Sequence, residues 1–337
     1  MFGFARARRF ALVAVVALGA LAACAPNVDL TAVQQYAVLA QQSQASFDAI
    51  AGDYDASCER QRELNLRADY LTWKPDVASA SNTPHAGQKP FFGTTVQETC
   101  VVTTGYAKYP LGAVSRDWKL ANQTLLEYIH SLGALANVAA APTPAIAPLT
   151  GAAVAANLIP APQATNIATF ANAIVAYWQR NARERDVARF LEAVNTVDPT
   201  TGKTSFAGAV EALDVAGSAY AILIYNECTE ITNLYAPALR VLSTMAHGAN
   251  EPLVIERAHR IRLHWASDLR ACAVHQNAAA GYLATLKKLS AANDALVKAE
   301  REPLTSRAAL FTDLADLSDS VSALYALLFS KAAIPAP

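Results

Sequence analysis

Hydrophobic residues recur every three or four positions over most of the chain, a spacing that predicts α-helices. The first such stripe follows Asp29, a residue type suited to the N-cap, and contains Val33, Tyr36, Ala40, Ser43, Phe47, Ile50 and Tyr54. The periodicity is lost over residues 69–112, where proline and glycine gather among serine and threonine. We therefore expect a helix and then one long irregular loop, with a short extended piece at residues 99–103.

A second helix is predicted to start near Ser115, with Trp118, Leu125, Ile129 and Leu132 on its apolar stripe. Residues 139–163 are rich in alanine and proline, which indicates a semi-rigid linker around one short helical piece. This linker is the best domain boundary in the chain. It separates N-terminal helices over residues 30–138 from a C-terminal region over residues 164–331, and residues 332–337 form a tail.

Four helices are expected in the C-terminal region. Their stripes cover residues 167–194, 206–242, 252–298 and 304–328, and Pro237 should kink the second of them. The short turn at residues 247–250 should make the two longest helices antiparallel, each roughly 60 to 70 Å long at about 1.5 Å per residue. The predicted fold is an all-α, elongated multi-helix bundle with long antiparallel helices.

The N-terminus has the order of a secretory signal. Arg6, Arg8 and Arg9 precede an apolar stretch over residues 11–20, which is shorter than the roughly 20 residues that a membrane-spanning helix needs. The sequence Leu21-Ala22-Ala23-Cys24 that follows resembles the lipobox of bacterial lipoprotein precursors. The resemblance implies that residues 1–23 are removed, that Cys24 is acylated, and that residues 24–29 form a short lipidated linker.

The resemblance also implies a location. Ala25 follows the cysteine where, in Gram-negative members of that family, an aspartate favours retention in the inner membrane. We therefore expect an envelope protein held in the lipid bilayer by Cys24, on the outer membrane facing the periplasm. Without residues 1–23 the chain has 24 basic and 28 acidic residues, a net charge of −4. A nucleic-acid partner is not expected, because phosphate recognition requires a dominant basic surface.

Four cysteines follow Cys24, and an even number in an exported chain favours disulfides. Cys228 and Cys272 lie 21 and 23 residues from Ala249 in the predicted turn, so antiparallel helices place them at the same height. We predict a Cys228–Cys272 disulfide, and with it Cys58–Cys100. Glu227 and His275 flank the first bridge and could form a partly buried pair.

Candidate chemistry is sparse, and neither a cofactor nor a metal site is expected. Glu127 with His130, and Glu256 with His259, each match the Glu-x-x-His pattern of di-iron bundles. Both pairs nevertheless fall on the outer faces of their helices at 100° per residue. The stripes contain mainly alanine, leucine, isoleucine and valine, and no buried polar cluster is evident. A non-enzymatic structural or partner-binding role is favoured; the alternative is a helical bundle that binds or transforms a small molecule or metal.

The loop closed by Cys58 and Cys100 is the candidate partner-binding surface, because long loops without regular structure are usually functional or disordered. Its candidate contacts are Tyr70, Trp73, His85, Lys89, Phe91, Phe92, Tyr106 and Tyr109, and aromatic residues dominate interface hot spots. The partner would be an envelope protein or a cell-wall component. The competing interpretation is that these aromatic side chains fold inward and cap the end of the bundle.

Overall fold

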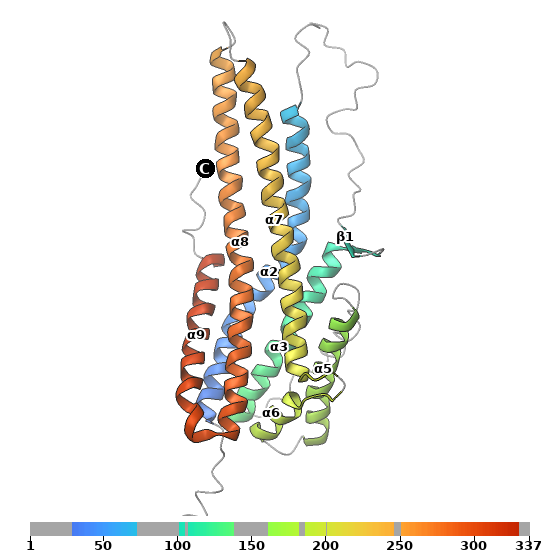
Figure 1. The fold of residues 1–337 in the computed structure, drawn as a ribbon, viewed down its shortest axis with the longest axis vertical. Coiled ribbons are helices and arrows are strands. Elements are labelled where there is room, and N and C mark those ends of the chain that lie inside the picture. The colour runs from blue at the N-terminus through green and yellow to red at the C-terminus, as the bar shows by residue number, and fades with distance from the viewer. Residues whose placement is uncertain are drawn as a thin grey trace, which may run out of the picture.

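The computed structural model describes residues 29–72, 101–104, 107–137, 161–181, 186–199, 201–245 and 251–329. The helices in these ranges are α2 (Leu30–Thr72), α3 (Leu111–Ala136), α5 (Ala161–Asn181), α6 (Val187–Asn195), α7 (Ser205–Met245), α8 (Glu251–Arg301) and α9 (Pro303–Phe329). Strands β1 (Val101–Thr104) and β2 (Ala107–Pro110) pair antiparallel. The long helices run along one axis (Figure 1), so the predicted all-α, elongated bundle is confirmed.

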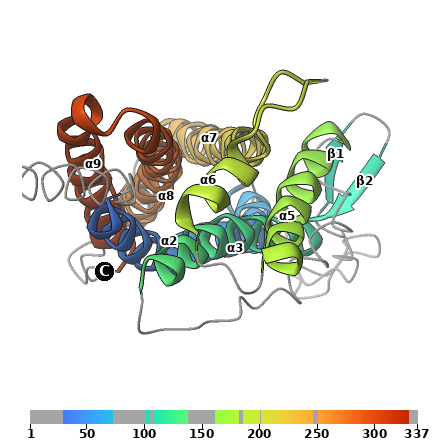
Figure 2. The ribbon, with the colours of Figure 1, turned by 90° about the horizontal axis from the view of Figure 1, so that it is seen from below.

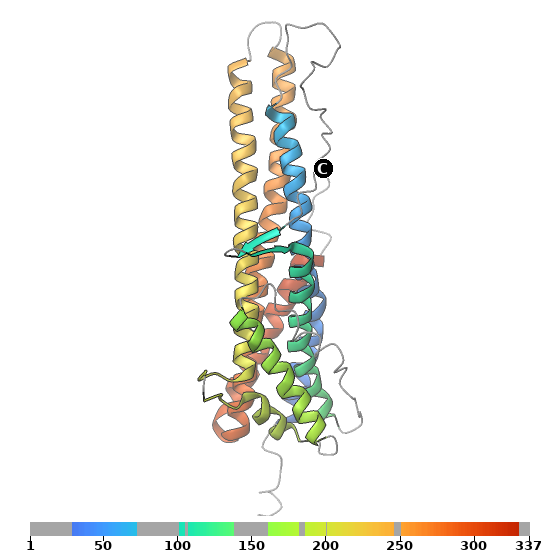
Figure 3. The same cartoon turned by 90° about the vertical axis from the view of Figure 1, so that its right-hand side faces the viewer.

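The bundle has a thick end and a thin end. We call the thick end the base, where α2 and α3 line one side and α7, α8 and α9 line the other (Figure 2). Helix α6 lies between the two sides and α5 lies at their flank. Past the β1–β2 hairpin, the described helices that continue are α2, α7 and α8, and we call this part the stalk (Figure 3). The stalk ends where α7 stops at Met245 and α8 starts at Glu251.

The starts of α2 and α6 follow from local hydrogen bonding. Asp29 caps α2, because its Oδ1 accepts hydrogen bonds from the backbone N–H groups of Thr31 and Ala32 at 3.1 and 3.2 Å. Asp186 caps α6 in the same way, by accepting from the N–H of Arg189. The single helix predicted over residues 167–194 is therefore wrong: it is two helices, α5 and α6. The C-terminal region contains five described helices instead of four.

The predicted loop and linker are also shorter than expected. Residues 69–72 belong to α2, residues 111–112 belong to α3, and residues 161–163 belong to α5. Strands β1 and β2 occupy residues 101–104 and 107–110, which confirms an extended piece but adds a partner strand. Residues 73–100 and 138–160 lie outside the described part of the chain. Helix α7 continues through Pro237.

The two halves of the sequence share one core in the base. Tyr36 and Trp118 from the first half and Tyr220 and Tyr282 from the second are fully or almost fully buried in one hydrophobic cluster. The stalk has a separate and smaller cluster, made of Leu64, Ile231, Tyr235, Leu242, Ile261 and Cys272. The alanine- and proline-rich linker is therefore a boundary in the sequence but not in the packing of the base.

The core of the base contains polar networks that the hydrophobic stripes did not reveal. Tyr128 Oη donates to Asn293 Oδ1 at 2.9 Å, Asn293 Nδ2 donates to Asn195 Oδ1 at 3.0 Å, and Asn195 Nδ2 contacts Tyr128 Oη at 3.3 Å. Trp118 Nε1 donates to Tyr282 Oη at 2.9 Å. The expectation that no polar cluster is buried is wrong, and these networks fix how α3, α6 and α8 pack.

Among the described residues, one helix, α7, is long and apolar enough to cross a membrane by length and composition alone. Core helices of soluble proteins pass the same test, and 39% of its most apolar window is buried inside the bundle.

Candidate functional site

A layer of polar and charged side chains separates the core of the base from the core of the stalk. Along α2 it contains Asp53 and Arg60, along α7 Tyr220 and Glu227, and along α8 His275. We call these five residues the charged layer. Leu64, Ile231 and Cys272 of the stalk core lie on one side of it, while Ile50, Leu213 and Ala278 of the base core lie on the other. Three helices therefore change from apolar to charged packing at the same height.

Arg60 joins α2 to α7 by binding two carboxylates. Its Nη1 lies 2.7 Å from Asp53 Oδ1, and its Nε lies 2.6 Å from Glu227 Oε1. Its Nη2 adds hydrogen bonds to Asp53 Oδ2 at 3.1 Å and to Glu227 Oε2 at 3.3 Å. Each of the two carboxylates thus accepts hydrogen bonds from Arg60 through both of its oxygens, a geometry that the planar guanidinium favours. The Glu227 side chain is only 6% exposed, so Arg60 supplies the charge that its burial requires.

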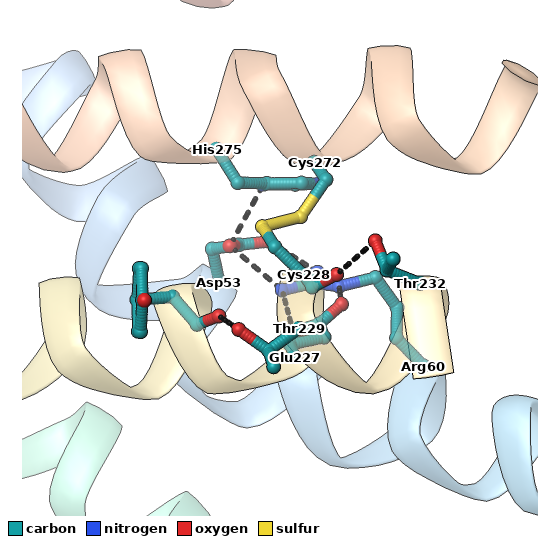
Figure 4. Close-up of a disulfide and its surroundings, with 9 residues drawn as sticks. Asp53, Arg60, Glu227, Cys228, Thr229, Thr232, Cys272 and His275 are labelled. Atoms are coloured by element: carbon teal, nitrogen blue, oxygen red, sulfur yellow. Dashed lines mark hydrogen bonds and ion pairs between the residues drawn. A yellow bond between two sulfur atoms is a disulfide. The ribbon is translucent and has the colours of Figure 1, made fainter. Parts of the chain in front are cut away.

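Asp53 joins the third helix to the layer. His275 Nδ1 on α8 lies 3.0 Å from Asp53 Oδ2, and Tyr220 Oη on α7 donates a hydrogen bond to the same oxygen. One carboxylate therefore contacts side chains from α2, α7 and α8. Figure 4 shows Asp53 and Arg60 reaching toward His275 and Glu227 beside the Cys228–Cys272 bridge.

The pKa values follow from this geometry. Burial alone would raise the pKa of Asp53, but the hydrogen bonds and charges of His275 and Arg60 outweigh it and hold that pKa well below its usual range. Burial, followed by the negative charge of Asp53, raises the pKa of Tyr220 far above its usual range. Asp53 is therefore ionised and Tyr220 remains a hydrogen-bond donor at neutral pH, which suits a structural role better than acid–base catalysis.

The predicted Cys228–Cys272 disulfide is present and lies next to the charged layer. It joins α7 to α8 with a Cα–Cα distance of 5.8 Å. The height argument from the turn was therefore right. Glu227 and His275 do flank the bridge as predicted, but their partners are Arg60 and Asp53 on α2, so the expected contact between the two residues is wrong.

A small pocket of about 70 Å³ opens beside the bridge. It is lined by Arg60, Leu64, Glu227, Ile231, Asp268, Ala271, Cys272 and His275. Sites for small molecules usually measure roughly 300 to 1,000 Å³, so this pocket has room for a few water molecules only. The Cys272 sulfur in its lining is bonded to Cys228, and the Arg60 guanidinium already holds the Glu227 carboxylate. This pocket therefore offers no cysteine thiol as a nucleophile.

The Glu-x-x-His pairs lie where the helical geometry predicted. His130, Glu256 and His259 are exposed, and Glu127 is half-buried. The Glu256 carboxylate is paired with Arg260 one turn further along α8. Within the described ranges, no group of three or more histidine, cysteine, aspartate or glutamate side chains is placed to hold a metal ion.

The other predicted site residues are outside the part of the structure that can be described. Cys24, Trp73, His85, Lys89, Phe91, Phe92, Cys100 and Tyr106 all lie in undescribed ranges. Cys58 and Tyr70 belong to α2 and Tyr109 belongs to β2, but the positions of their side chains are not described. The Cys58–Cys100 disulfide and the partner-binding loop therefore stay predictions. Of the two predicted disulfides, the described residues contain one.

Sequence reasoning missed Asp53, Arg60 and Tyr220. A signal for the first two exists: Asp53, Ser57, Arg60 and Leu64 follow one another at spacings of four, three and four on α2. That spacing continues the buried face of the helix, so two charges of opposite sign on it indicate a buried pair.

Comparison with protein-family models, with curated proteins and with solved structures finds no match to this chain.

Proposed function

We propose that this protein is a non-enzymatic lipoprotein of the bacterial cell envelope, held on a membrane by acylated Cys24, whose stalk stands away from that membrane. The observation that supports this arrangement is the position of the first described residue. Asp29 lies at the base, where its carboxylate pairs with Arg307 at the start of α9 at 2.9 Å. Four residues separate Cys24 from Asp29, and these five Cα–Cα steps reach roughly 17 Å when extended. The base would therefore lie close to the lipid.

The same arrangement places the stalk far from the anchor. Helix α8 runs from the stalk end at Glu251 to the base at Arg301, which is about 75 Å at 1.5 Å per residue. The end of the stalk would stand at that distance from the anchoring lipid, facing the periplasm if the outer membrane is the anchor. This geometry suits a structural or partner-binding role toward an envelope protein or the cell wall.

The small-molecule alternative depends on the pocket beside the disulfide. A site for a substrate would need a larger enclosed volume than about 70 Å³ and a polar group not already used in the fold. The charged layer supplies neither, because its two carboxylates both bind Arg60. The non-enzymatic role is therefore the better supported of the two.

The anchoring test compares the native protein with its Cys24→Ser variant in whole cells. We expect native protein in the membrane fraction, released by detergent, and the variant in the soluble envelope fraction. An Ala25→Ser variant is the matched control and should stay on the membrane. In a Gram-negative host, an Ala25→Asp variant should move from the outer to the inner membrane on a density gradient. Unchanged membrane association of the Cys24→Ser variant would contradict the proposal.

The partner test uses crosslinking of the native lipoprotein in intact cells, followed by identification of the copurified material. We expect an envelope protein or a cell-wall fragment attached to the protein. Turnover of a small molecule by the purified protein, lost in an Arg60→Gln variant that still folds, would favour the enzyme alternative instead.

A further inference from the structure

The end of the stalk exposes large apolar side chains. We call residues 240–245 of α7 and 251–264 of α8 the stalk tip. Thirteen large hydrophobic side chains are exposed among the described residues, and five of them belong to these 20 positions. They are Val241, Met245, Leu253, Ile255 and Leu263, with exposures from 48% to 69%. Exposed apolar residues gathered at one end of a molecule indicate a contact surface.

The same segment is basic, whereas the protein as a whole is acidic. Residues 240–264 contain four arginines and two glutamates, a net charge of +2 with histidine neutral. The rest of the chain after residue 23 then has a net charge of −6. Arg240, Arg260 and Arg262 are exposed, so their charges face outward from the stalk. A partner for this surface should therefore be anionic.

The order of these side chains along the axis is the third observation. At 1.5 Å per residue, Leu253 and Ile255 lie about 3 and 6 Å from the start of α8, and Met245 is the last residue of α7. Arg260 and Arg262 lie about 14 and 17 Å from that start. Leu253, Ile255 and Met245 are thus nearest the end of the stalk, and the arginines of α8 lie behind them, with Leu263 at the height of Arg262.

The acidic residues of the tip fit this order. Glu251 lies in the first turn of α8, where a carboxylate favours the positive end of the helix dipole. Glu256 is paired with Arg260, and Arg240 and Arg262 are exposed. The tip therefore presents apolar groups first and positive charge second.

We propose that the stalk tip binds an anionic phospholipid surface. Apolar side chains at an amphipathic surface enter the boundary between headgroups and acyl chains to a depth of roughly 5 to 10 Å, and arginines then contact the phosphates. If the base is anchored through Cys24 as proposed above, the lipid at the tip belongs to a second membrane surface, and the protein connects the two. Binding by the tip itself does not depend on the anchor.

The test uses the mature chain without its acyl groups, carrying Cys24→Ser and made in an oxidising compartment. It is mixed with vesicles of phosphatidylcholine, either pure or with about one third phosphatidylglycerol, and bound protein is separated by flotation. We expect binding to the anionic vesicles that weakens with added salt, and little binding to the neutral ones. Because this chain lacks the lipid anchor, the result is independent of the Cys24 fractionation test.

Variants assign the binding to the tip. An Arg240→Gln, Arg262→Gln double variant should lower partitioning by about fivefold per arginine, the effect expected of one basic residue near an anionic surface. A Leu253→Ser, Ile255→Ser double variant should lower it at least tenfold. Ile222→Ser, on α7 outside the tip with 62% exposure, and Arg116→Gln, on α3 with a 76% exposed side chain, are matched controls that should bind normally.

Three results would overturn the proposal. The first is equal binding to neutral and anionic vesicles, and the second is normal binding by both tip variants. The third is no vesicle binding by the folded protein, in which case loss of crosslinked protein in the same tip variants would identify a protein as the occupant instead.

Discussion

Replacing Asp53 by asparagine should test whether the charged layer holds the three stalk helices together. The asparagine side chain has the same size, but it has no charge and places an N–H₂ group among donors. Its amide would face the Arg60 guanidinium, which now lies 2.7 Å from a carboxylate oxygen, and the His275 Nδ1 at 3.0 Å. One carbonyl oxygen can still accept from Tyr220. The substitution therefore removes the ion pair with Arg60 and weakens the contact with His275, and it leaves N–H groups facing each other at Arg60.

The magnitude follows from the burial of the partners. Breaking a fully buried ion pair costs roughly 3–5 kcal/mol, because the remaining charge is left without compensation. Here the side chains of Asp53, Arg60 and His275 are 19%, 25% and 26% exposed, so solvent partly screens the loss. We expect Asp53→Asn to lower the free energy of unfolding at pH 7 by about 2–3 kcal/mol.

The pH dependence gives a second, independent signature. The pKa of Asp53 is lowered in the folded protein, so the ionised group stabilises the fold fully above the pKa of the unfolded chain, about 3.9. That contribution is lost as the pH falls below this value toward the folded pKa. The difference in unfolding free energy between the native protein and Asp53→Asn should therefore be constant from pH 7 to pH 5 and smaller at pH 3.

The assay is guanidinium denaturation followed by circular dichroism at pH 7, 5 and 3. Asp55→Asn is the matched control, since Asp55 is an exposed residue two positions along the same helix. It should change the unfolding free energy by less than about 0.5 kcal/mol. The reasoning is refuted if Asp53→Asn behaves like this control at pH 7, or if its difference from the native protein does not shrink at pH 3.

Three further predictions concern the disulfide, the packing and the loop. Replacing both Cys228 and Cys272 by serine should keep the helical circular dichroism signal but lower the unfolding free energy by about 3–4 kcal/mol in guanidinium titrations, because the bridge closes a loop between residues 44 apart. Gly217→Ala should lower the unfolding free energy by about 1–2 kcal/mol in the same assay, because the added Cβ would lie 2.7 Å from Leu283 and Tyr282. Gly281→Ala is the control and should be close to neutral, because its Cβ would meet only a flexible methyl group of Leu324 at 3.0 Å. Replacing Trp73, Phe91 and Phe92 by alanine should abolish partner capture in the crosslinking experiment with a stability change within about 1 kcal/mol; unfolding would instead show that these residues cap the bundle.

The long helices could be predicted because their determinants are local. Apolar spacing along one segment was enough to locate α2, α3, α7, α8 and α9. The Cys228–Cys272 bridge followed from the same local geometry, because a short turn fixes the relative height of two neighbouring helices. The break between α5 and α6 was missed because arginine and glutamate at residues 183–185 are good helix formers. Asp186 caps α6, but in the sequence an aspartate at this position cannot be distinguished from a charged residue on the surface of a continuous helix.

The charged layer could not be predicted in the same way. Arg60 and Glu227 are 167 residues apart, and so are Asp53 and Tyr220. No turn connects α2 to α7 directly, so their relative height depends on the packing of the whole base. The hydrogen bonds among Tyr128, Asn195 and Asn293 could not be predicted for the same reason, because each of these residues belongs to a different helix. Polar residues on apolar stripes indicate that such contacts exist, but not which residues form them.

The continuity of α8 past the disulfide determines how the molecule would respond to mechanical force. Its 51 residues extend from the tip into the base, where the Tyr36 hydroxyl donates to the Leu289 carbonyl oxygen at 2.9 Å. A pull on the tip would load α7 and α8 in shear, and the covalent Cys228–Cys272 bridge would stop one helix from sliding along the other. The two helices would share the force and transmit it to the base as one rigid unit. Tension applied at the tip would then reach Asp29, at the opposite end, without extending the thin core of the stalk.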